Sequence, residues 1–591
     1  MVIDSKLHRD FFNTEISTII RKDDQLKSKR ISDLINEKKL FIGRLVEYDD
    51  VNGYFTFRLN KKYPTPRQFT EYFLGLIGDK AWSFDTNPMN WTFTYKEFRK
   101  SDKTNNFWNQ RLGGNIQTER FYKEDSDRSY FQIIISDTVL ANKFKSIIDQ
   151  NPWVLITEPD PPLKYLQNLR DFVIQNPNNT ITGLPVDYDL KNWRPNLIDN
   201  TDSIASKIGD WSSSEELIII QGPPGTGKSY NAALFCNDML KANKSVCICA
   251  LANKALMEIS AQDGLQNALL ENRVWKTNLS DYEKKELPNL QDYDGGLPAQ
   301  GELLLSSYYK LSMIAMELLQ NNNRYDVLII EEASQAFLAT IALFKSIAKK
   351  VILIGDHMQL PPVINTNISK LVKIHEGIMG VVNGMATLAS AYEKQSFRLT
   401  KTRRLTNAAA SQTGLFYEGT LGSISELNNT DLHMGKYQTL FDENGGSTIL
   451  ELPVAHPDYS IEYVKKLIIW AVSSIIELGD FSISVLAQTR VLETDLTRSL
   501  VNVNSDSNDI TISTVHKIQG ITVDYSILYL PLKDPINELG ENFFNVATSR
   551  AKRGALIITY DQLKMVVGKT PAVQTFLNQA KSIDFRKINF W

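Results

Sequence analysis

The sequence predicts an α/β protein in which two successive parallel-sheet units follow a smaller β-rich unit. From about residue 215, short apolar runs such as "ELIIIQG", "SVCICAL" and "KVILIGD" alternate with segments of helical length. A second series, "SISVLAQ", "ITISTVH", "YSILYLP" and "GALIITY", follows after about residue 395. Continuous apolar runs of this length are typical of strands buried on both faces, and their alternation with helices indicates parallel sheets.

The first part of the chain has a different pattern. Residues 7–40 combine helical apolar spacing with many charges, whereas "LFIGRLVEY", "GYFTFRL", "WTFTY" and "YFQIIIS" are typical of short strands between turns. We therefore expect a small barrel or sheet over 41–155. The segment "DPPLKYLQNLRDFVIQNPNN" then returns to helix. The insert 265–300, rich in Asn, Asp and Gly, is expected to be a surface excursion.

Composition excludes several classes of protein. With 591 residues the chain is too long for one ordinary core, and its longest apolar runs are shorter than the roughly 20 residues of a membrane span. The N-terminus lacks the apolar segment of a signal peptide. Three cysteines supply neither a disulfide framework nor a zinc quartet, and Cys247 and Cys249 alternate as on one face of a buried strand. We expect a cytoplasmic protein without membrane contact.

The net charge of −3 does not by itself indicate a nucleic-acid-binding protein, although a local groove can still be basic. Function must therefore be sought in motifs.

The segment "QGPPGTGKSY" fits the phosphate-binding pattern G-x-x-x-x-G-K-[ST] between a strand and a helix. Its glycines let backbone N–H groups turn toward a phosphate, at the positive N-terminus of the next helix. Lys228 would neutralise the β and γ oxygens, and the Ser229 hydroxyl would ligate Mg²⁺. An ordinary glycine turn is the alternative, which the strand–loop–helix context disfavours. The predicted nucleotide-binding residues are Gly222, Pro223, Pro224, Gly225, Thr226, Gly227, Lys228 and Ser229.

Two neighbouring acids, Glu331 and Glu332, end the apolar strand "VLII". The carboxyl ends of parallel strands share one edge, so this pair should lie beside the phosphate loop. One acid can then serve Mg²⁺ and the other the attacking water, the alternative being a solvated strand end. The next strand runs into "GDHMQLPPV", which places Gln359 to sense the γ-phosphate and two prolines, Pro361 and Pro362, to stiffen the departing loop.

Together these motifs resemble those of superfamily 1B helicases, the branch that includes RecD-like enzymes and nonsense-mediated-decay or senataxin-like enzymes. The segments "CALANKAL", "LTKTRRL", "TISTVHKIQGITVD" and "NVATSRAKRG" extend the likeness, in the family's order, over about 215–560. The resemblance implies two tandem RecA-like domains with ATP and Mg²⁺ between them, and a barrel-like domain on a helical stalk. It divides the chain into a stalk (1–40), a barrel (41–155), a second stalk helix (156–185) and two motor domains (186–395 and 396–591).

The resemblance also assigns roles to later residues. It implies that Glu331 joins Ser229 as a Mg²⁺ ligand and that Glu332 accepts the proton of the attacking water. Arg404 and Arg550 would reach the γ-phosphate from the second motor domain, as catalytic partners of Glu332 and Gln359. Further nucleotide contacts would come from Arg403, Gln519 and Gly520, and nucleic-acid contacts from Asn253, Lys254, Pro361, Thr514 and His516. For His516 alone, a packed hydrogen-bonding role is the alternative.

Three positions depart from the family pattern. Most relatives have Asp where this chain has Glu331, and the decay-type relatives have an aromatic residue where it has Arg403. The upstream glutamine that reads adenine is not found in "NWRPNLIDNTDSIASKI".

The resulting hypothesis is an ATP-dependent 5′-to-3′ helicase or translocase that acts as a monomer on single-stranded nucleic acid, with DNA preferred over RNA. An ATP-gated clamp or remodelling factor, possibly directed at RNA, is the alternative. A metabolic P-loop kinase would not need the second unit and its arginines.

Overall fold

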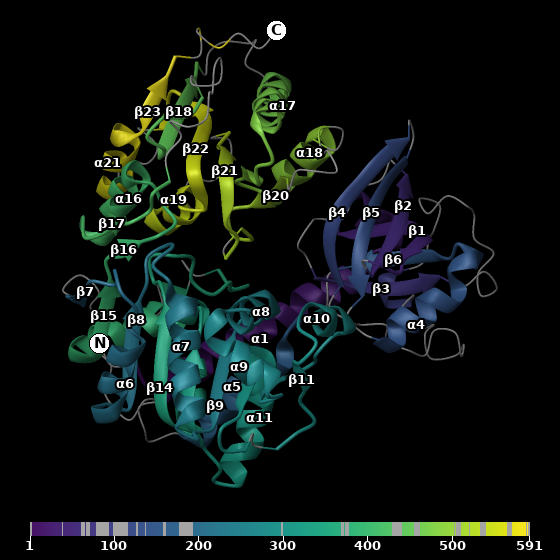
Figure 1. Ribbon diagram of the computed structural model, residues 1–591. Helices are drawn as coiled ribbons and strands as arrows, with labels where there is room; N and C mark the ends of the chain where they lie inside the picture. The colour runs from purple at the N-terminus through teal and green to yellow at the C-terminus, as the bar shows by residue number, and fades with distance from the viewer. Residues whose placement is uncertain are drawn as a thin grey trace.

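The computed structural model comprises two α/β units, one above the other in Figure 1, and a barrel beside them. The structure describes residues 3–588 with gaps, the main ones being 61–65, 67–70, 78–93, 98–115, 177–192, 428–439, 454–460, 504–509, 532–538 and 564–569. Within the described residues, no helix combines the length and apolar character that crossing a bilayer requires.

The first α/β unit is built on a nine-stranded sheet whose neighbouring strands all pair in parallel. Its order is β11-β10-β12-β9-β13-β14-β8-β15-β7. The strands are β7 (Asn196–Ile198), β8 (Leu217–Gln221), β9 (Val246–Ala250), β10 (Val274–Lys276), β11 (Gln291–Asp292), β12 (Leu303–Ser307), β13 (Tyr325–Ile330), β14 (Ala348–Gly355) and β15 (Ser396–Leu399).

Both faces of this sheet are covered by helices, which explains the continuous apolar runs of its strands. Along β9, Cys247 and Cys249 join the hydrophobic cluster on one face, and Val246 and Ile248 join the cluster on the other. The strand interpretation of the two cysteines is confirmed. The covering helices are α6 (Ala205–Ser214), α7 (Lys228–Lys241), α8 (Asn253–Ser260), α11 (Tyr308–Gln320), α12 (Leu338–Ser346), α14 (Ile378–Val382) and α15 (Gly384–Ala391).

Two sequence-based boundaries need correction. The insert 265–300 is not only a surface excursion, because its strands β10 and β11 extend the sheet beyond β12. The first unit also does not end at residue 395: β15 pairs with β8 and β7 inside the first sheet. The chain therefore leaves the first unit after Leu399. The pairing partners of these short strands are remote in sequence, which is why periodicity did not place them.

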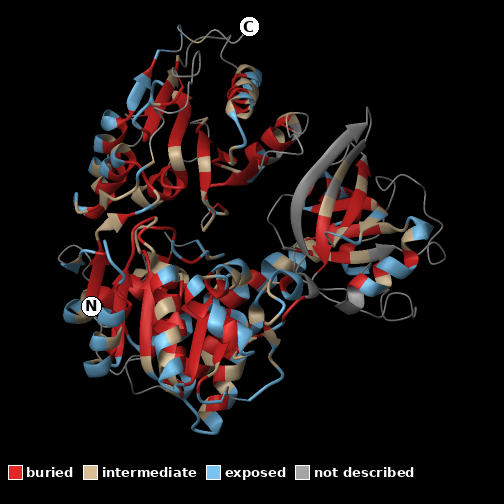
Figure 2. Ribbon diagram, viewed as in Figure 1, coloured by how far each residue is buried: buried red, intermediate tan, exposed pale blue. Residues whose placement is uncertain are grey.

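The second α/β unit contains a six-stranded parallel sheet in the order β20-β19-β21-β22-β18-β23. Figure 2 shows buried residues along the strands of both sheets and exposed residues on the outer helix faces. The strands are β18 (Ser447–Leu452), β19 (Ile483–Ala487), β20 (Ile510–Thr514), β21 (Val523–Tyr529), β22 (Ala551–Tyr560) and β23 (Lys581–Ile583). The helices are α16 (Asn407–Gly414), α17 (Ile461–Leu478), α18 (Arg490–Leu500), α19 (Glu541–Thr548) and α21 (Pro571–Gln579). Two parallel α/β units are thus confirmed.

A closed antiparallel barrel forms the third unit, in the order β1-β2-β5-β4-β3-β6 with β1 pairing β6. Closure removes unpaired sheet edges, which are sites of unwanted association. The strands are β1 (Leu40–Asp49), β2 (Tyr54–Asn60), β3 (Glu71–Ile77), β4 (Ile116–Asp125), β5 (Arg128–Ile135) and β6 (Trp153–Thr157), accompanied by α2 (Ile31–Asn36) and α4 (Thr138–Ile147). The predicted β-rich unit is confirmed.

Two helices carry the barrel on the first α/β unit. Helix α1 (Ser5–Lys27) begins at an Asp4 side-chain cap and buries one apolar face in the core of that unit. Helix α5 (Leu163–Gln175) is tied to the same unit through polar contacts. The Tyr165 hydroxyl lies 2.5 Å from Thr340 Oγ1, and Asn168 Nδ2 donates to Ser312 Oγ at 3.2 Å. The stalk is therefore anchored to the unit that holds the phosphate loop.

Candidate nucleotide site between the two α/β units

The phosphate loop joins β8 to the N-terminus of α7, as its sequence predicts. Gly225 and Gly227 have φ values of +74° and +80°, the left-handed region that glycine adopts without a Cβ penalty. Lys228 Nζ donates to the Gly222 carbonyl at 2.7 Å, and Thr226 Oγ1 donates to the Pro223 carbonyl at 2.8 Å. These two hydrogen bonds close the loop on itself, around the side chain of Lys228 at the start of α7.

Ser229 and Glu331 meet directly at this edge of the sheet. Ser229 Oγ donates to Glu331 Oε1 at 2.7 Å, whereas Glu331 Oε2 is buried and has no hydrogen-bond partner among the described residues. Burial and then the neighbouring Glu332 carboxylate raise the pKa of Glu331 to about 7. A hydroxyl and a carboxylate are hard oxygen donors, and Mg²⁺ takes few protein ligands because it keeps several waters and phosphate oxygens. These residues fit a Mg²⁺ ion.

The strand ends at Ile330, and the backbone turns at Glu332. Its φ of 53° and ψ of 39° are left-handed, and it precedes the short turn Ala333–Gln335. Such a conformation costs a non-glycine residue on the order of 1–3 kcal/mol and concentrates at functional sites. The second acid therefore has a backbone conformation that the strand-end sequence alone did not indicate.

Gln359 lies buried beyond the end of β14. Its Nε2 donates to Asp356 Oδ2 at 3.2 Å, while its Oε1 has no hydrogen-bond partner within the described part of the chain. Asp356 also accepts from Gln221 Nε2 at 3.3 Å and from the Tyr417 hydroxyl at 2.5 Å. Asp356 and Tyr417 were not among the predicted site residues. Their sequence signals are the strand-end acid in "LIGDHMQ" and the tyrosine in "FYEGTL".

A hydrogen-bond network connects this strand end to the second unit. Asn545, on α19, donates from Nδ2 to the Tyr417 hydroxyl and to the Met358 carbonyl, both at 2.7 Å. Asn542, on the same helix, donates to the His357 carbonyl at 2.9 Å. Helix α19 leads directly to Arg550, so the segment that carries Gln359 and the segment that carries Arg550 are in contact.

Replacing Tyr417 by phenylalanine is expected to weaken this connection. Hydrogen bonds to a charged group contribute about 1.5–3 kcal/mol, which corresponds to at least a roughly tenfold loss if ATP turnover requires the connected arrangement. Steady-state ATP hydrolysis and thermal unfolding measure the effect. Tyr529→Phe is the matched control, because it removes a buried hydroxyl of the same unit that lies 3.3 Å from Tyr560 Oη. Equal effects of the two variants on turnover would contradict the prediction.

Arg550 follows α19 and is buried at the boundary of the two units. Its Nε donates to the Val546 carbonyl at 3.2 Å, and one terminal nitrogen, Nη2, has no hydrogen-bond partner in the described residues. Burial lowers the pKa of Arg550, and Glu332 acts in the opposite direction. Burial and the nearby Arg550 guanidinium lower the pKa of Arg404 to about 9. The guanidinium groups of Arg404 and Arg550 are therefore close together, and two like charges in a buried place form a site suited to a polyanion.

The chain reaches Arg404 after it leaves the first sheet at Leu399, and the Arg404 backbone lies against the phosphate loop. Thr402 Oγ1 donates to the Pro224 carbonyl at 2.8 Å, and the Arg403 amide donates to the Gly225 carbonyl at 2.9 Å. A Cβ on Gly225 would lie 2.3 Å from Arg404 Cβ. Arg404 therefore belongs to the junction between the units, where β16 (Lys401–Thr402) pairs with β17 (Gly422–Ser423).

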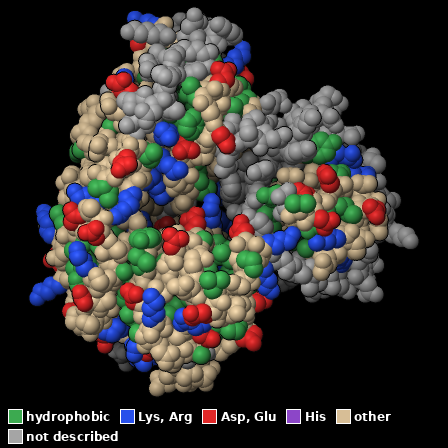
Figure 3. Space-filling view, in the orientation of Figure 1, with side chains coloured by type: hydrophobic (Ala, Val, Ile, Leu, Met, Phe, Trp, Pro, Cys, Tyr) green, Lys and Arg blue, Asp and Glu red, His purple; other side chains and the backbone are tan. Residues whose placement is uncertain are grey.

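Asn200 and Glu258 are further residues of the site that the motifs did not indicate. The buried Asn200 amide donates to the Thr226 carbonyl at 2.9 Å and to the Lys401 carbonyl at 2.8 Å, so it joins the phosphate loop to the junction. Glu258, on α8, interacts electrostatically with Glu332, Arg404 and Arg550. Arg403 is exposed and donates from its guanidinium to the Thr201 carbonyl. Basic and acidic side chains gather along the boundary between the units on the face drawn in Figure 3.

The predicted nucleic-acid contacts lie at the carboxyl ends of three strands. Asn253 and Lys254 begin α8 after β9, and Pro361 is exposed after β14. Near the end of β20, His516 is exposed whereas the Thr514 side chain is buried. Asn253 is further held by a buried lysine: Lys276 Nζ lies 3.4 Å from Asn253 Oδ1 and 3.0 Å from Glu283 Oε1. Gly520 has a φ of +87°, and Gln519 lies outside the described residues.

One family model and three curated relatives are similar to parts of this chain. A family model described as an AAA domain matches residues 207–365, which include the phosphate loop, both glutamates and Gln359. "Regulator of nonsense transcripts 1" of Dictyostelium discoideum is 25% identical over 292 residues, or 42% of this chain and 21% of that protein. "DNA polymerase alpha-associated DNA helicase A" of Schizosaccharomyces pombe is 20% identical over 408 residues, or 58% and 61%. "DNA replication ATP-dependent helicase/nuclease DNA2" of Saccharomyces cerevisiae is 23% identical over 168 residues, or 28% and 11%.

The chain is similar to superfamily 1B helicases. It aligns with less than two thirds of the length of each of these three relatives. Glu331 is longer than the Asp that the resemblance leads us to expect at this position, and the structure shows how the longer side chain is accommodated. The Glu331 amide is held by the Cys249 carbonyl at 2.8 Å, and its carboxylate still reaches Ser229 Oγ. The longer acid thus preserves the serine–carboxylate pair of the site.

Proposed function

We propose that the protein is an ATP-dependent 5′-to-3′ helicase or translocase that acts on single-stranded nucleic acid, with DNA preferred over RNA. The observation that carries the proposal is the site at the boundary of the two α/β units. There, the Ser229–Glu331 pair and Glu332 lie beside Arg404 and Arg550. A phosphate loop needs little else for phosphoryl transfer, which depends on positioning and charge stabilisation.

The proposed chemistry divides the work among these side chains. Lys228 and the loop amides hold the β and γ phosphates of ATP, and Mg²⁺ bound by Ser229 and Glu331 supplies charge neutralisation. Glu332 orients the attacking water and accepts its proton. The two arginines stabilise the charge of the transferring phosphoryl group, and Gln359 senses whether it is present. Through Asp356 and Tyr417 that information passes to α19.

In this proposal the nucleic-acid strand crosses the carboxyl ends of both sheets. Asn253, Lys254, Pro361 and His516 would contact it, and phosphate contacts at such surfaces carry most of the sequence-independent affinity. The segments "LTKTRR" and "TVHKIQG" are more similar to RecD-like DNA helicases, which supports the preference for DNA. Two of the three relatives are also named as DNA helicases. We propose a monomer that works in the cytoplasm.

Duplexes with one single-stranded tail test this function. DNA and RNA duplexes with either a 5′ or a 3′ tail are incubated with the full chain and ATP, and strand separation and ATP hydrolysis are followed together. The expected result is ATP-dependent separation of the 5′-tailed DNA duplex. Separation of 3′-tailed substrates alone would overturn the direction, and stimulation by RNA alone would overturn the preference for DNA. Stimulated hydrolysis without any strand separation would identify an ATP-gated clamp instead.

A further inference from the structure

The stalk helix α1 contains a buried acid that the nucleotide chemistry does not use. Glu15 is 2% exposed. Its Oε1 accepts from the Asn365 amide at 2.6 Å, and its Oε2 accepts from the Thr366 amide at 2.9 Å and from the Thr366 hydroxyl. On the exposed side of the same contact, Lys22 Nζ donates to the Asn365 carbonyl at 2.8 Å.

The hydrogen bonds of Glu15 fix the backbone conformation at Asn365 and Thr366, in addition to joining these residues to α1. A buried carboxylate is unfavourable unless hydrogen bonds compensate its desolvation, and charge-assisted bonds to N–H groups are among the strongest available. Both oxygens of Glu15 are compensated only when the Asn365 and Thr366 amides point toward α1 together. The helix therefore selects one shape of the segment 363–367.

The segment 363–367 is the exit of the γ-phosphate sensor. It begins directly after Pro362 and a short distance after Gln359. Pro361 is a proposed nucleic-acid contact. At its other end the sensor is held by the second unit: Leu360 packs in a hydrophobic cluster of that unit, and Asn542 donates to the Gln359 carbonyl. The chain between Gln359 and Thr366 is thus attached to the second unit at one end and to the stalk at the other.

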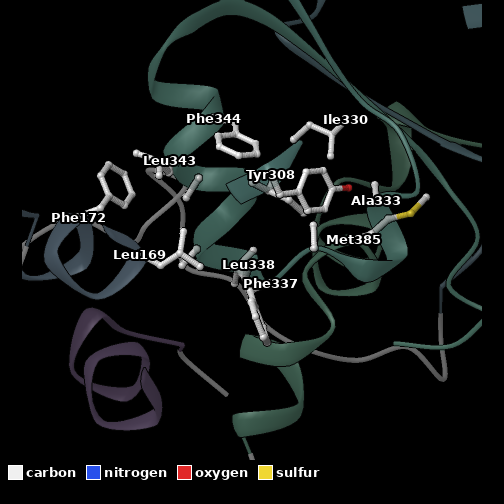
Figure 4. Packing of buried hydrophobic residues seen from close by; sticks show 14 of the residues in the cluster. Leu169, Phe172, Tyr308, Ile330, Ala333, Phe337, Leu338, Leu343, Phe344 and Met385 are labelled. Atoms are coloured by element: carbon white, nitrogen blue, oxygen red, sulfur yellow. The ribbon is translucent and has the colours of Figure 1, made fainter. Parts of the chain in front are cut away.

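Helix α1 also contacts the exit of the catalytic strand. Phe11 and Phe12 pack against Phe337 with ring centroids 5.8 and 5.7 Å apart, and Phe337 follows closely after Glu332. Figure 4 shows Phe337 beside Leu338 in the buried cluster to which Phe11 and Phe12 also belong. The same helix therefore touches both segments that leave the nucleotide site.

We propose that Glu15 is a positioning residue through which the stalk helix couples the γ-phosphate sensor to the barrel. When the sensor responds to the γ-phosphate, the segment 363–367 transmits the change to α1, and α1 carries it to the barrel. This inference rests on the proposed helicase function, because the barrel matters only when a nucleic acid is engaged. Glu15 touches no reacting atom and is expected to act on coupling, not on hydrolysis itself.

The test compares Glu15→Gln with a matched control. Glutamine has nearly the same size but replaces one acceptor oxygen with an N–H donor that faces another donor. Asp10→Asn removes a carboxylate from an exposed position of the same helix. For each full-length protein we would measure ATP hydrolysis without nucleic acid, hydrolysis stimulated by single-stranded DNA, and ATP consumed per base pair separated. Thermal unfolding and amide hydrogen exchange at Asn365 and Thr366 accompany these measurements.

For Glu15→Gln the expected result is hydrolysis without nucleic acid within about twofold of wild type, a roughly tenfold rise in ATP consumed per base pair and faster exchange of the two amides. Asp10→Asn should match wild type in all three. Lys22→Met, which removes only the exposed contact, should change coupling in the same direction by a smaller factor. Unchanged coupling in Glu15→Gln would overturn the inference, and so would an equal loss of basal and stimulated hydrolysis. A wild-type protein whose ATP hydrolysis does not respond to single-stranded DNA and that separates no tailed duplex would instead refute the proposed function.

Discussion

Replacing Glu332 by glutamine is expected to lower ATP turnover by about a thousandfold while ATP and nucleic-acid binding persist. An amide of the same size cannot accept the proton of the attacking water, and a positioned general base contributes roughly 10²- to 10⁴-fold. The Ser229–Glu331 hydrogen bond does not involve Glu332, so the proposed metal-binding oxygens should be preserved. Single-turnover hydrolysis and equilibrium binding of a fluorescent ATP analogue measure the two properties separately.

Glu258→Gln is the matched control for this variant. Glu258 lies in the same electrostatic neighbourhood as Glu332, so its replacement removes one negative charge near the two arginines without removing the proposed base. Hydrolysis in the Glu258 variant is expected to stay within about tenfold of wild type. Near-normal hydrolysis in Glu332→Gln would exclude Glu332 as the base, and a similar loss in both variants would indicate that charge balance alone is responsible.

Replacing Arg550 by lysine is expected to reduce the kcat of ATP hydrolysis by about a thousandfold, with a much smaller change in KM. An arginine finger contributes about 10³- to 10⁵-fold, and lysine keeps the charge but lacks the planar fork that contacts two oxygens. The structure already uses Nε of Arg550 to hold the Val546 carbonyl, which leaves Nη2 for the phosphate. A steady-state titration with ATP at saturating DNA measures both constants.

Arg553→Lys provides the comparison for Arg550, because Arg553 lies on β22, the strand that follows Arg550 directly, but contacts Asp524 and the Phe481 ring. Its variant should hydrolyse ATP at nearly the wild-type rate. Thermal unfolding of both variants shows whether the buried Arg550 also supports the fold. An Arg550 variant that raises KM alone would contradict a role in the transition state.

The parts of the fold that the sequence predicted correctly are those governed by local pattern. Strands buried on both faces need continuous apolar runs, so β8, β9, β13 and β14 could be recognised without their neighbours. The phosphate loop has fixed spacing because its backbone must wrap one phosphate. In contrast, β10, β11 and β15 are short, and backbone pairing with remote strands defines them.

The missed site residues have the same explanation. The side chain of Asn200 bridges residues 226 and 401, and Tyr417 meets Asp356 and Asn545. No spacing along the chain indicates such contacts, because the fold alone brings the partners together. Glu258 was missed for a different reason. A single acid on a helix after a motif shows no sequence pattern that distinguishes it from a solvated surface residue. Its place in the site depends on the approach of the second unit.

The attachment of Arg404 to the phosphate loop gives the two arginines different mechanical supports. Hydrogen bonds from Thr402 and Arg403 join the Arg404 backbone to Pro224 and Gly225. Arg550 instead follows α19, whose Asn542 and Asn545 contact the segment after β14. In the proposed cycle we therefore expect a change at the phosphate loop to displace Arg404 and a change at Gln359 to displace Arg550. Nucleotide binding and γ-phosphate sensing would then act through different arginines.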